Sequence, residues 1–377
     1  MKKRLIRIVL TVALLGMLGA GIWYAQLTTR HKAIVKTWLL QHTGIADASW
    51  KTSNASGHYR MVSPTFLVDG IYKSMEGPKA SSYVQLTPDS SLIWITRFDV
   101  KAFDAKSGEQ LSNDFICHTN IDFNDAAYFS SFGLHDRVGQ QYPRMTSLSH
   151  GLEDFALPKG FGIPMKGNEL LYVTTETLNH NDPDIRKWVR HEIDIDYARE
   201  RLKPLMSRTV FIQLPYDKAD PFKGPLDPGA TQCLPVETKN HSYTDPSGQT
   251  YSGHWVIPPG KRTYRASIDD MLRLKDSARL HAAALHVHPF ATRMTLRDVT
   301  TGKTVFESTI RNHRNRIGID RIGDYVSEAG TMLYANHSYE LVLETDNTTA
   351  VNQDMMGSAF LFFYDAELDQ KINTKKR

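Results

Sequence analysis

The sequence predicts an all-β protein in which two tandem antiparallel β-sandwich domains follow an N-terminal membrane anchor. Several segments alternate polar and apolar side chains with a period of two, which is typical of half-buried strands. Long helical periodicity is absent after residue 45. A length of 377 residues is enough for about two domains, each of which buries its own core.

The composition is that of an ordinary globular protein, with 23% charged and 41% hydrophobic residues. Lys and Arg total 45 against 41 for Asp and Glu, so the formal net charge is only +4. Basic residues cluster at the two ends of the chain, and the middle carries mixed signs without a basic stripe. The charge pattern therefore excludes a nucleic acid as the expected partner.

Residues 1–27 read as a signal-anchor or transmembrane helix. Three basic residues at positions 2–4 precede a charge-free apolar run from Ile8 to Ala25. The bulky Trp23 lies where a cleavage site needs a small side chain, and the run is close to the roughly 20 residues that span a bilayer. Flanking positive charges stay in the cytoplasm, so we expect a membrane-anchored protein with its body on the extracytoplasmic (periplasmic or extracellular) side.

Residues 28–50 are expected to form a stalk, because apolar positions recur at helical spacing up to Ile45. The N-terminal sandwich is expected over 51–214. Within it, 91–100 and 189–197 alternate as strands, and Ser107-Gly108 marks a hairpin turn.

Residues 215–253 are crowded with Pro, Gly, Asp and Ser and predict a linker or long surface loop. The C-terminal sandwich is expected over 254–370. There, Thr301-Gly302 separates two β-rich arms, and 339–345 and 359–364 are the final strands.

Only Cys117 and Cys233 occur, far apart in the chain, which excludes a disulfide framework. In an exported protein the two thiols can form one long-range bridge. Alternatively, a thiol beside a histidine can be a metal ligand. The sequence leaves both interpretations open.

His286 and His288 form a His-x-His pair in LHAAALHVHPF. Residues i and i+2 on a strand project from the same face, so both imidazoles can reach one metal ion. Met355 and Met356 precede the last apolar strand, and a thioether combined with imidazole selects copper. The alternative is a solvated histidine pair and methionines that pack in the core.

Three further histidines of the N-terminal half are candidates: His118 beside Cys117, His150, and His180 in a loop after LLYVTT. Adjacent strand residues point to opposite faces, so Cys117 and His118 can bind one ion together only if the strand is bulged or ends there. Each histidine taken alone is otherwise a surface residue.

Four segments resemble, in order, landmarks of the copper type II, ascorbate-dependent monooxygenases. They are LPKGFGIPM (157–165), HWVIPPGKR (254–262), HVH (286–288) and DMMGSAFLFFYD (354–365). The resemblance spans about residues 90–366. It implies that both sandwiches are jelly-roll-like and that each carries one copper ion, so that a chain binds up to two.

The resemblance also assigns the ligands. The C-terminal copper falls on His286, His288 and Met356, with Met355 as the alternative methionine. The N-terminal copper falls on His118 and His180, and Cys117 stands where the family has the first of two adjacent histidines.

On this basis we expect an exported copper-binding protein that hydroxylates a C–H bond of a small-molecule substrate with an external reductant. Ala284, Ser358 and Phe360 stand at the family's carboxylate-clamp positions, so a peptidylglycine substrate is not expected. The first alternative is a non-catalytic copper-binding or delivery protein with the same fold. The second is a metal-free binding module at the cell surface.

Overall fold

The computed structural model describes residues 2–216 and 242–374. Strands account for 49% of the chain and helices for 19%, which confirms the predicted all-β class. Most of the helical residues lie in α1 (Lys2–Gln26) and α2 (Thr29–His42), outside the sheets. The remaining helices are short: α3 (Asp125–Phe132), α4 (Asp269–Leu272), α5 (Ala366–Thr374), and the 3-10 turns η1 (Asn113–Phe115) and η2 (His135–Arg137).

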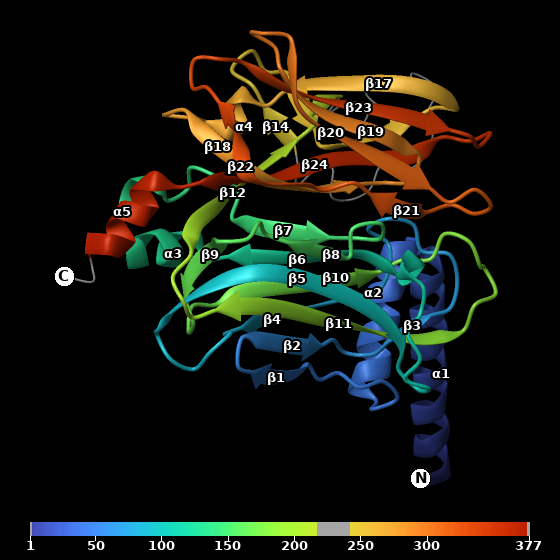
Figure 1. Ribbon diagram of the computed structural model, residues 1–377. Coiled ribbons are helices and arrows are strands. Elements are labelled where there is room, and N and C mark those ends of the chain that lie inside the picture. The colour runs from blue at the N-terminus through green and yellow to red at the C-terminus, as the bar shows by residue number, and fades with distance from the viewer. Residues whose placement is uncertain (1, 217–241, 375–377) are drawn as a thin grey trace.

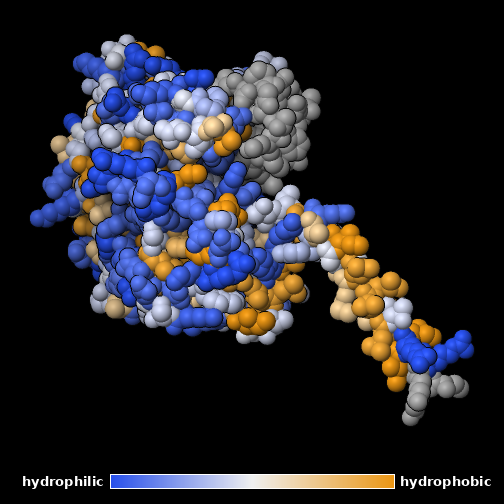
Figure 2. All heavy atoms as spheres, turned by 90° about the vertical axis from the view of Figure 1, so that its right-hand side faces the viewer, coloured by the Kyte–Doolittle hydropathy of each residue, from blue (hydrophilic) through white to orange (hydrophobic). Residues whose placement is uncertain are grey.

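The two N-terminal helices differ in how they meet the body. No residue of the Arg4–Gln26 part of α1 is buried, and this part is apolar and long enough to cross a membrane, by length and composition alone. Figure 2 shows it projecting away from a largely hydrophilic surface. By contrast, α2 packs against the body through the buried Ala33 and Thr37.

The first half of the body has two layers of strands (Figure 1). One layer contains β1, β2, β11, β5 and β9, and the other has the order β4-β10-β6-β7. The bounds are β1 (Lys51–Ala55), β2 (His58–Val62), β3 (Phe66–Val68), β4 (Lys79–Val84), β5 (Leu92–Asp104), β6 (Ile116–Phe123), β7 (Arg144–Leu148), β8 (Asp154–Ala156), β9 (Phe161–Lys166), β10 (Leu171–Thr177) and β11 (Lys187–Ala198). Alternating side chains of β5 and β11, such as Phe98 and Ile193, are fully buried between the layers.

The second half also has two layers. One contains β12, β24, β18, β22 and β16, and the other has the order β17-β23-β19-β20-β21. The bounds are β12 (Lys203–Phe211), β16 (His254–Ile257), β17 (Gly260–Ser267), β18 (Ala278–Val287), β19 (Ala291–Asp298), β20 (Lys303–Asn312), β21 (Ile319–Ile322), β22 (Tyr325–Leu333), β23 (Tyr339–Asn347) and β24 (Gln353–Tyr364).

The segment predicted as a linker contributes a small sheet. β13 (Leu214–Tyr216), β14 (Ser242–Thr244) and β15 (Thr250–Ser252) pair in the order β13-β15-β14. Cys233 lies outside the described residues, and so does a Cys117–Cys233 bridge, one of the two interpretations that the sequence leaves open.

Strand β12 joins the two halves. It pairs with β24 from Leu205 to Phe211, and its first residues, Lys203 and Pro204, pair in parallel with β9. One twelve-stranded sheet therefore continues from the first half into the second. Strand β7 of the four-stranded sheet faces this junction (Figure 1), so the two halves meet between β7 and the layer that contains β12 and β24.

Both predicted hairpin turns are present. Gly108 and Gly302 have φ angles of 76° and 72°, in the left-handed region that glycine adopts without steric cost. Gly302 connects β19 to β20, and Gly108 follows β5. The sequence predicts these turn positions because the backbone conformation that they require restricts the residue type.

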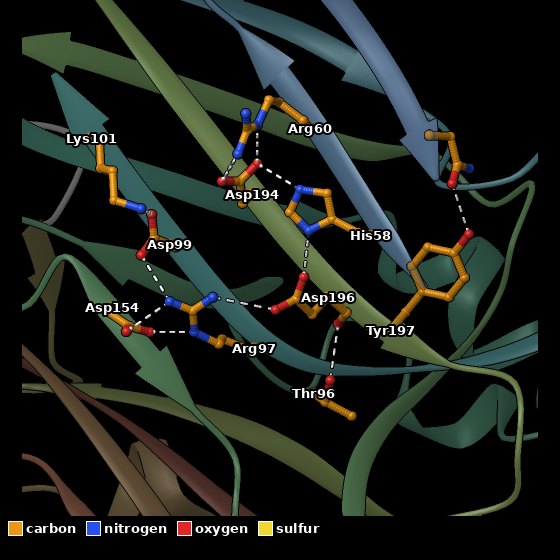
Figure 3. A network of polar contacts seen from close by, with 11 residues as sticks. His58, Arg60, Thr96, Arg97, Asp99, Lys101, Asp154, Asp194, Asp196 and Tyr197 are labelled. Atoms are coloured by element: carbon orange, nitrogen blue, oxygen red, sulfur yellow. Dashed lines mark hydrogen bonds and ion pairs between the residues drawn. The ribbon is translucent and has the colours of Figure 1, made fainter. Parts of the chain in front are cut away.

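A network of ion pairs connects the strands of the first half (Figure 3). The Arg97 guanidinium contacts Asp154 at 2.7 and 2.8 Å, Asp99 at 3.0 Å and Asp196 at 3.3 Å. His58 bridges Asp196 and Asp194, with nitrogen–oxygen distances of 2.6 and 3.2 Å. The network links β2, β11, β5 and β8, which are strands of one sheet.

Candidate functional site

Six histidines from both halves gather where the two halves meet, and we call them, with Asp354, the histidine cluster. His118 lies on β6, His150 in the turn after β7, and His180 just after β10. From the second half come His254 on β16, His286 on β18 and His288 just after β18, while Asp354 lies near the start of β24. Five of the imidazoles are at most 6% exposed, namely His118, His150, His254, His286 and His288.

The rings form a continuous series of neighbours. The centroids of His118 and His286 are 5.9 Å apart, those of His286 and His288 are 5.6 Å apart, and those of His288 and His254 are 5.5 Å apart. Asp354 Oδ2 lies 2.7 Å from His288 Nδ1, although the two atoms are not aligned as a hydrogen bond.

Many polar atoms of the cluster are buried without a hydrogen-bond partner among the described residues. They are His150 Nε2, His180 Nδ1, His286 Nδ1 and His288 Nε2. Buried polar atoms are nearly always satisfied by protein, water or an ion, because an unsatisfied one costs about 1–3 kcal/mol. Such a concentration of orphaned atoms therefore indicates a ligand.

Burial keeps the imidazoles neutral. Loss of solvation lowers the pKa of His150 to about 3 and that of His180 to about 4, and neighbouring histidines add to both effects. Burial, and then the neighbouring His288, His118, His150 and His254, lower the pKa of His286 well below its ordinary value. A neutral imidazole offers a free lone pair, which is the form that binds metals.

Asp354 is held ionised in the same environment. Burial alone would raise its pKa, but the adjacent His288, His180 and His254 outweigh this effect and bring the pKa below its ordinary value. The cluster thus combines neutral imidazoles with one carboxylate, a donor set that suits a divalent transition-metal ion.

The sulfur-containing candidates lie at the edge of the cluster. Met356 is paired with His254 across β24 and β16, and it lines a cavity together with His118 and His286. The neighbouring Met355 is fully buried and does not line that cavity. Of the two methionines, Met356 is therefore the one available to a ligand.

Cys117 lies at an irregularity in β6. The register with β10 passes from His118↔Glu176 to Ile116↔Thr177 and so skips Cys117, as in a β-bulge. Its Sγ is 3.3 Å from His118 Nδ1, and its side chain also packs with Met75 and Leu178. The bulge lets these two adjacent side chains approach each other, which a regular strand would prevent.

The cluster opens into a cavity of about 420 Å³ between the four-stranded sheet and β12, β18 and β24. Alternate residues of β4, β6 and β10 present polar side chains to it: Lys79, Ser81, His118, Asn120, Asp122, Thr174 and Glu176. Ser358 and Phe360 line the opposite wall. The cavity therefore opens the His118–His286 end of the cluster to solvent.

As the side chains are placed, no three His, Cys, Asp or Glu residues of the described segments form a group that could hold a metal ion. The residues assigned to two separate sites instead belong to one cluster, because His118 and His286 are adjacent. His254 and Asp354 join the cluster without having been predicted as ligands, since β16 and β24 bring them there.

The chain matches no family model and no curated protein. Its fold is similar to that of PNGase F, a glycosylasparaginase from Flavobacterium meningosepticum, with 10% identity over 80% of this chain and 95% of that chain and a TM-score of 0.34. It is also similar to the major capsid protein P2 of bacteriophage PM2, with 10% identity, coverage of 81% and 99%, and a TM-score of 0.31. At this level of similarity, neither likeness carries an argument about activity.

The predicted membership of the copper type II monooxygenases is therefore wrong. No family model matches the chain, and the solved structures to which its fold is similar include peptide-N-glycanases and a capsid protein. The functions predicted from that membership, copper-dependent hydroxylation and copper delivery, are therefore wrong as well. The physical reason is that the landmark segments coincide with turns and short strands such as β9 and β16, whose apolar and turn residues recur in many β-proteins.

Proposed function

We propose that the histidine cluster binds a transition-metal ion and that this ion faces a small polar ligand in the adjacent cavity. The observation that carries the proposal is the set of orphaned nitrogens on His150, His180, His286 and His288, buried where the two halves meet. Hydrophobic side chains would fill this space at lower cost if no ligand were bound.

The spacing of the rings fits a shared ion. A metal lies about 2.0–2.1 Å from an imidazole nitrogen, so the centroids of two imidazoles on one tetrahedral ion are roughly 5–6 Å apart. The three neighbouring pairs of the cluster have centroid distances of 5.5 to 5.9 Å. As the side chains are placed, the nitrogens do not point toward one ion, so metal binding would require the side chains to rotate.

The donor types leave two ions as candidates. Imidazoles with the Asp354 carboxylate suit Zn²⁺, whereas imidazoles with the Met356 thioether suit Cu(I). We propose Cu(I) as one candidate ion, because His118, His286 and Met356 line the cavity together. Zinc is favoured at His180, His288 and Asp354, which are mutual electrostatic neighbours.

Metal content tests the proposal directly. The full chain, purified in detergent, would be loaded separately with Zn²⁺ and, under anaerobic reducing conditions, with Cu(I), then desalted and subjected to elemental analysis. We expect a stoichiometric amount of at least one metal in the wild type and its loss in the His286→Asn, His288→Asn double variant. His135→Gln is the matched control, because His135 is exposed and outside the cluster.

Equal metal retention in the double variant and the control would overturn the proposal, as would a wild type that retains neither ion. Circular dichroism and thermal unfolding of each variant establish that the comparison is made on folded protein.

Metal-assisted hydrolysis is a second candidate function, favoured by Glu176. Glu176 is 1% exposed and is paired with His118 across β10 and β6. It lines the same cavity, and its carboxylate lies 4.0 Å from Lys79 Nζ. A bound ion supplies Lewis-acid activation of water, and a nearby carboxylate can accept the proton. We expect metal-loaded wild type to hydrolyse 4-nitrophenyl acetate faster than Glu176→Gln with the same metal content, and equal rates would exclude this role.

We further propose that α1 stays in the membrane and that the body lies on the extracytoplasmic side. Support comes from the basic residues before the apolar run and from the exposure of α1 outside the body. Two jelly-roll-like sandwiches are the corresponding proposal for the fold, because each half of the body has two packed layers of mainly antiparallel strands. Protease accessibility of the body in sealed spheroplasts tests the orientation.

A further inference from the structure

A second cavity, of about 310 Å³, lies away from the histidine cluster where α4 and α5 approach β12. Its charged lining comprises the cations Arg137, Arg208, Arg273 and Lys275 and the carboxylates Asp276, Asp365 and Glu367. Met206, Leu274 and Phe363 supply an apolar part. Cations therefore outnumber carboxylates by one in a partly enclosed space.

Most of these charges already have partners. Arg137 binds the Asp365 carboxylate and contacts Glu367 Oε2 at 2.5 Å. Lys275 Nζ is 3.1 Å from Asp136 Oδ2. Arg273 donates to the carbonyl oxygen of Asp270 at 2.8 Å and to Gln140 Oε1 at 3.3 Å.

Arg208 is the exception. Its side chain on β12 is half-buried in the wall of the cavity, and within residues 2–216 and 242–374 it makes no hydrogen bond or ion pair. Burial, together with the neighbouring Arg137 and Arg273, lowers the pKa of the guanidinium to about 10, although Asp365 partly offsets this. An arginine in a protein remains charged, so a buried positive charge without a direct ion-pair partner lines the described part of this cavity.

We propose that this cavity binds a small organic anion and that Arg208 is the residue that holds its phosphate or carboxylate group. A guanidinium presents a planar fork of donors that matches either group in a bidentate arrangement. The apolar side chains of Met206, Leu274 and Phe363 would contact the rest of the ligand. The proposal does not depend on the metal site.

The alternative role for Arg208 is structural, and a two-part experiment separates the two. Isothermal titration calorimetry of the full chain in detergent would use phenyl phosphate and benzoate as probes, at an ionic strength matched with sodium chloride. Phenyl phosphate, benzoate or both should bind the wild type, and the probe that binds identifies the anionic group. If neither binds beyond the chloride background, the proposal is overturned.

The second part uses variants. Arg208→Met should weaken binding of the probe at least tenfold, and Arg208→Lys, which keeps the charge but loses the fork, should have an intermediate effect. Arg321→Met is the matched control, because Arg321 is exposed on β21, away from the cavity. Unchanged affinity in Arg208→Met would contradict the assignment.

Thermal unfolding without the probe distinguishes a loss of binding from a loss of stability. Removal of this charge should leave the melting temperature of the Arg208→Met protein equal to or above that of wild type. A marked decrease without ligand would show that Arg208 stabilises the fold and would overturn its role as a ligand-binding residue.

Discussion

The imidazoles of His118 and His286 lie edge to face with their centroids 5.9 Å apart, although they come from different halves of the body. His118 is on the four-stranded sheet and His286 on the sheet that contains β12 and β24. Neither half can form this contact alone. The histidine cluster is therefore a product of the docking of the two halves, and metal binding would stabilise that docking by mass action.

Met356 should determine the preference of the site for copper. Replacement of Met356 by Leu conserves volume and should cost less than about 1.5 kcal/mol of stability. It should weaken Cu(I) binding but leave Zn²⁺ binding unchanged, because the thioether is a ligand for soft ions. Competition with a chromophoric chelator measures both affinities.

Met355→Leu provides the control for this prediction, since Met355 is fully buried and does not line the cavity. If the two variants bind Cu(I) equally well, Met356 is not a ligand.

Gly77 should not tolerate a larger residue. A Cβ added to Gly77 would lie 2.0 Å from the carbonyl oxygen of Thr177, at the end of β10 that leads to His180. Gly77→Ala should therefore lower the free energy of unfolding by about 1–3 kcal/mol, measured by urea titration. Gly70→Ala, where nothing lies within 4 Å of the added atom, should be nearly neutral. Similar values for the two variants would contradict the predicted clash.

Protonation of His191 should oppose folding in mild acid. Its Nε2 lies 3.1 Å from the carbonyl oxygen of Phe115 and must donate, so Nδ1, 2.6 Å from Thr175 Oγ1, accepts. Burial lowers its pKa to about 4, whereas an unfolded histidine has a pKa of about 6.5. The unfolded state thus binds the proton first, and stability present above about pH 6.5 is lost as the pH falls toward 4.

The free energy of unfolding should fall by up to about 1.4 kcal/mol for each pH unit between about pH 6.5 and pH 4. Urea unfolding at pH 7, 6 and 5 should show a smaller loss of stability in His191→Gln than in wild type. An identical pH dependence of the two proteins would rule out this contribution.

Arg97 should be the most sensitive member of the ion-pair network in Figure 3. Its loss leaves Asp99, whose side chain is 6% exposed, with Lys101 as its remaining ion-pair partner among the described residues. Arg97→Met should lower the free energy of unfolding by about 1–2 kcal/mol. This value is smaller than for a fully buried ion pair, because the Arg97 side chain is 35% exposed and solvent screens its charge.

The exposed pair of Arg199 and Asp89, 3.5 Å apart, provides the comparison. Arg199→Met should change the stability by no more than about 0.5 kcal/mol. An effect of Arg97→Met as small as this would show that the network does not act as a unit.

Local patterns predicted much of the fold. Strands β5 and β11 follow the alternation of side chains, and the turns at Gly108 and Gly302 follow from the residues that a positive φ admits. The pairing of β12 with β24 could not be predicted, because a register between strands far apart in the chain leaves no mark on either strand alone.

The same distinction applies to the histidine cluster. His286 and His288 were predictable as neighbours from strand geometry, and their ring centroids are 5.6 Å apart. The approach of His118 to Cys117 required a bulge, which depends on the register with β10. His254 and Asp354 were missed because each is a single polar residue next to apolar ones, and only the pairing of β16 with β24 places them together.

The attachment of α2 sets how far the body can move if α1 is held in a bilayer. Leu27 and Thr28 alone separate the two helices, and Lys36 Nζ lies 2.6 and 2.8 Å from the Asp69 carboxylate oxygens and 3.2 Å from Tyr72 Oη. No long flexible linker connects α1 to α2, so the body could not move through a wide volume. The mouth of the cavity beside the histidine cluster would therefore keep a nearly constant height and tilt relative to the lipid surface.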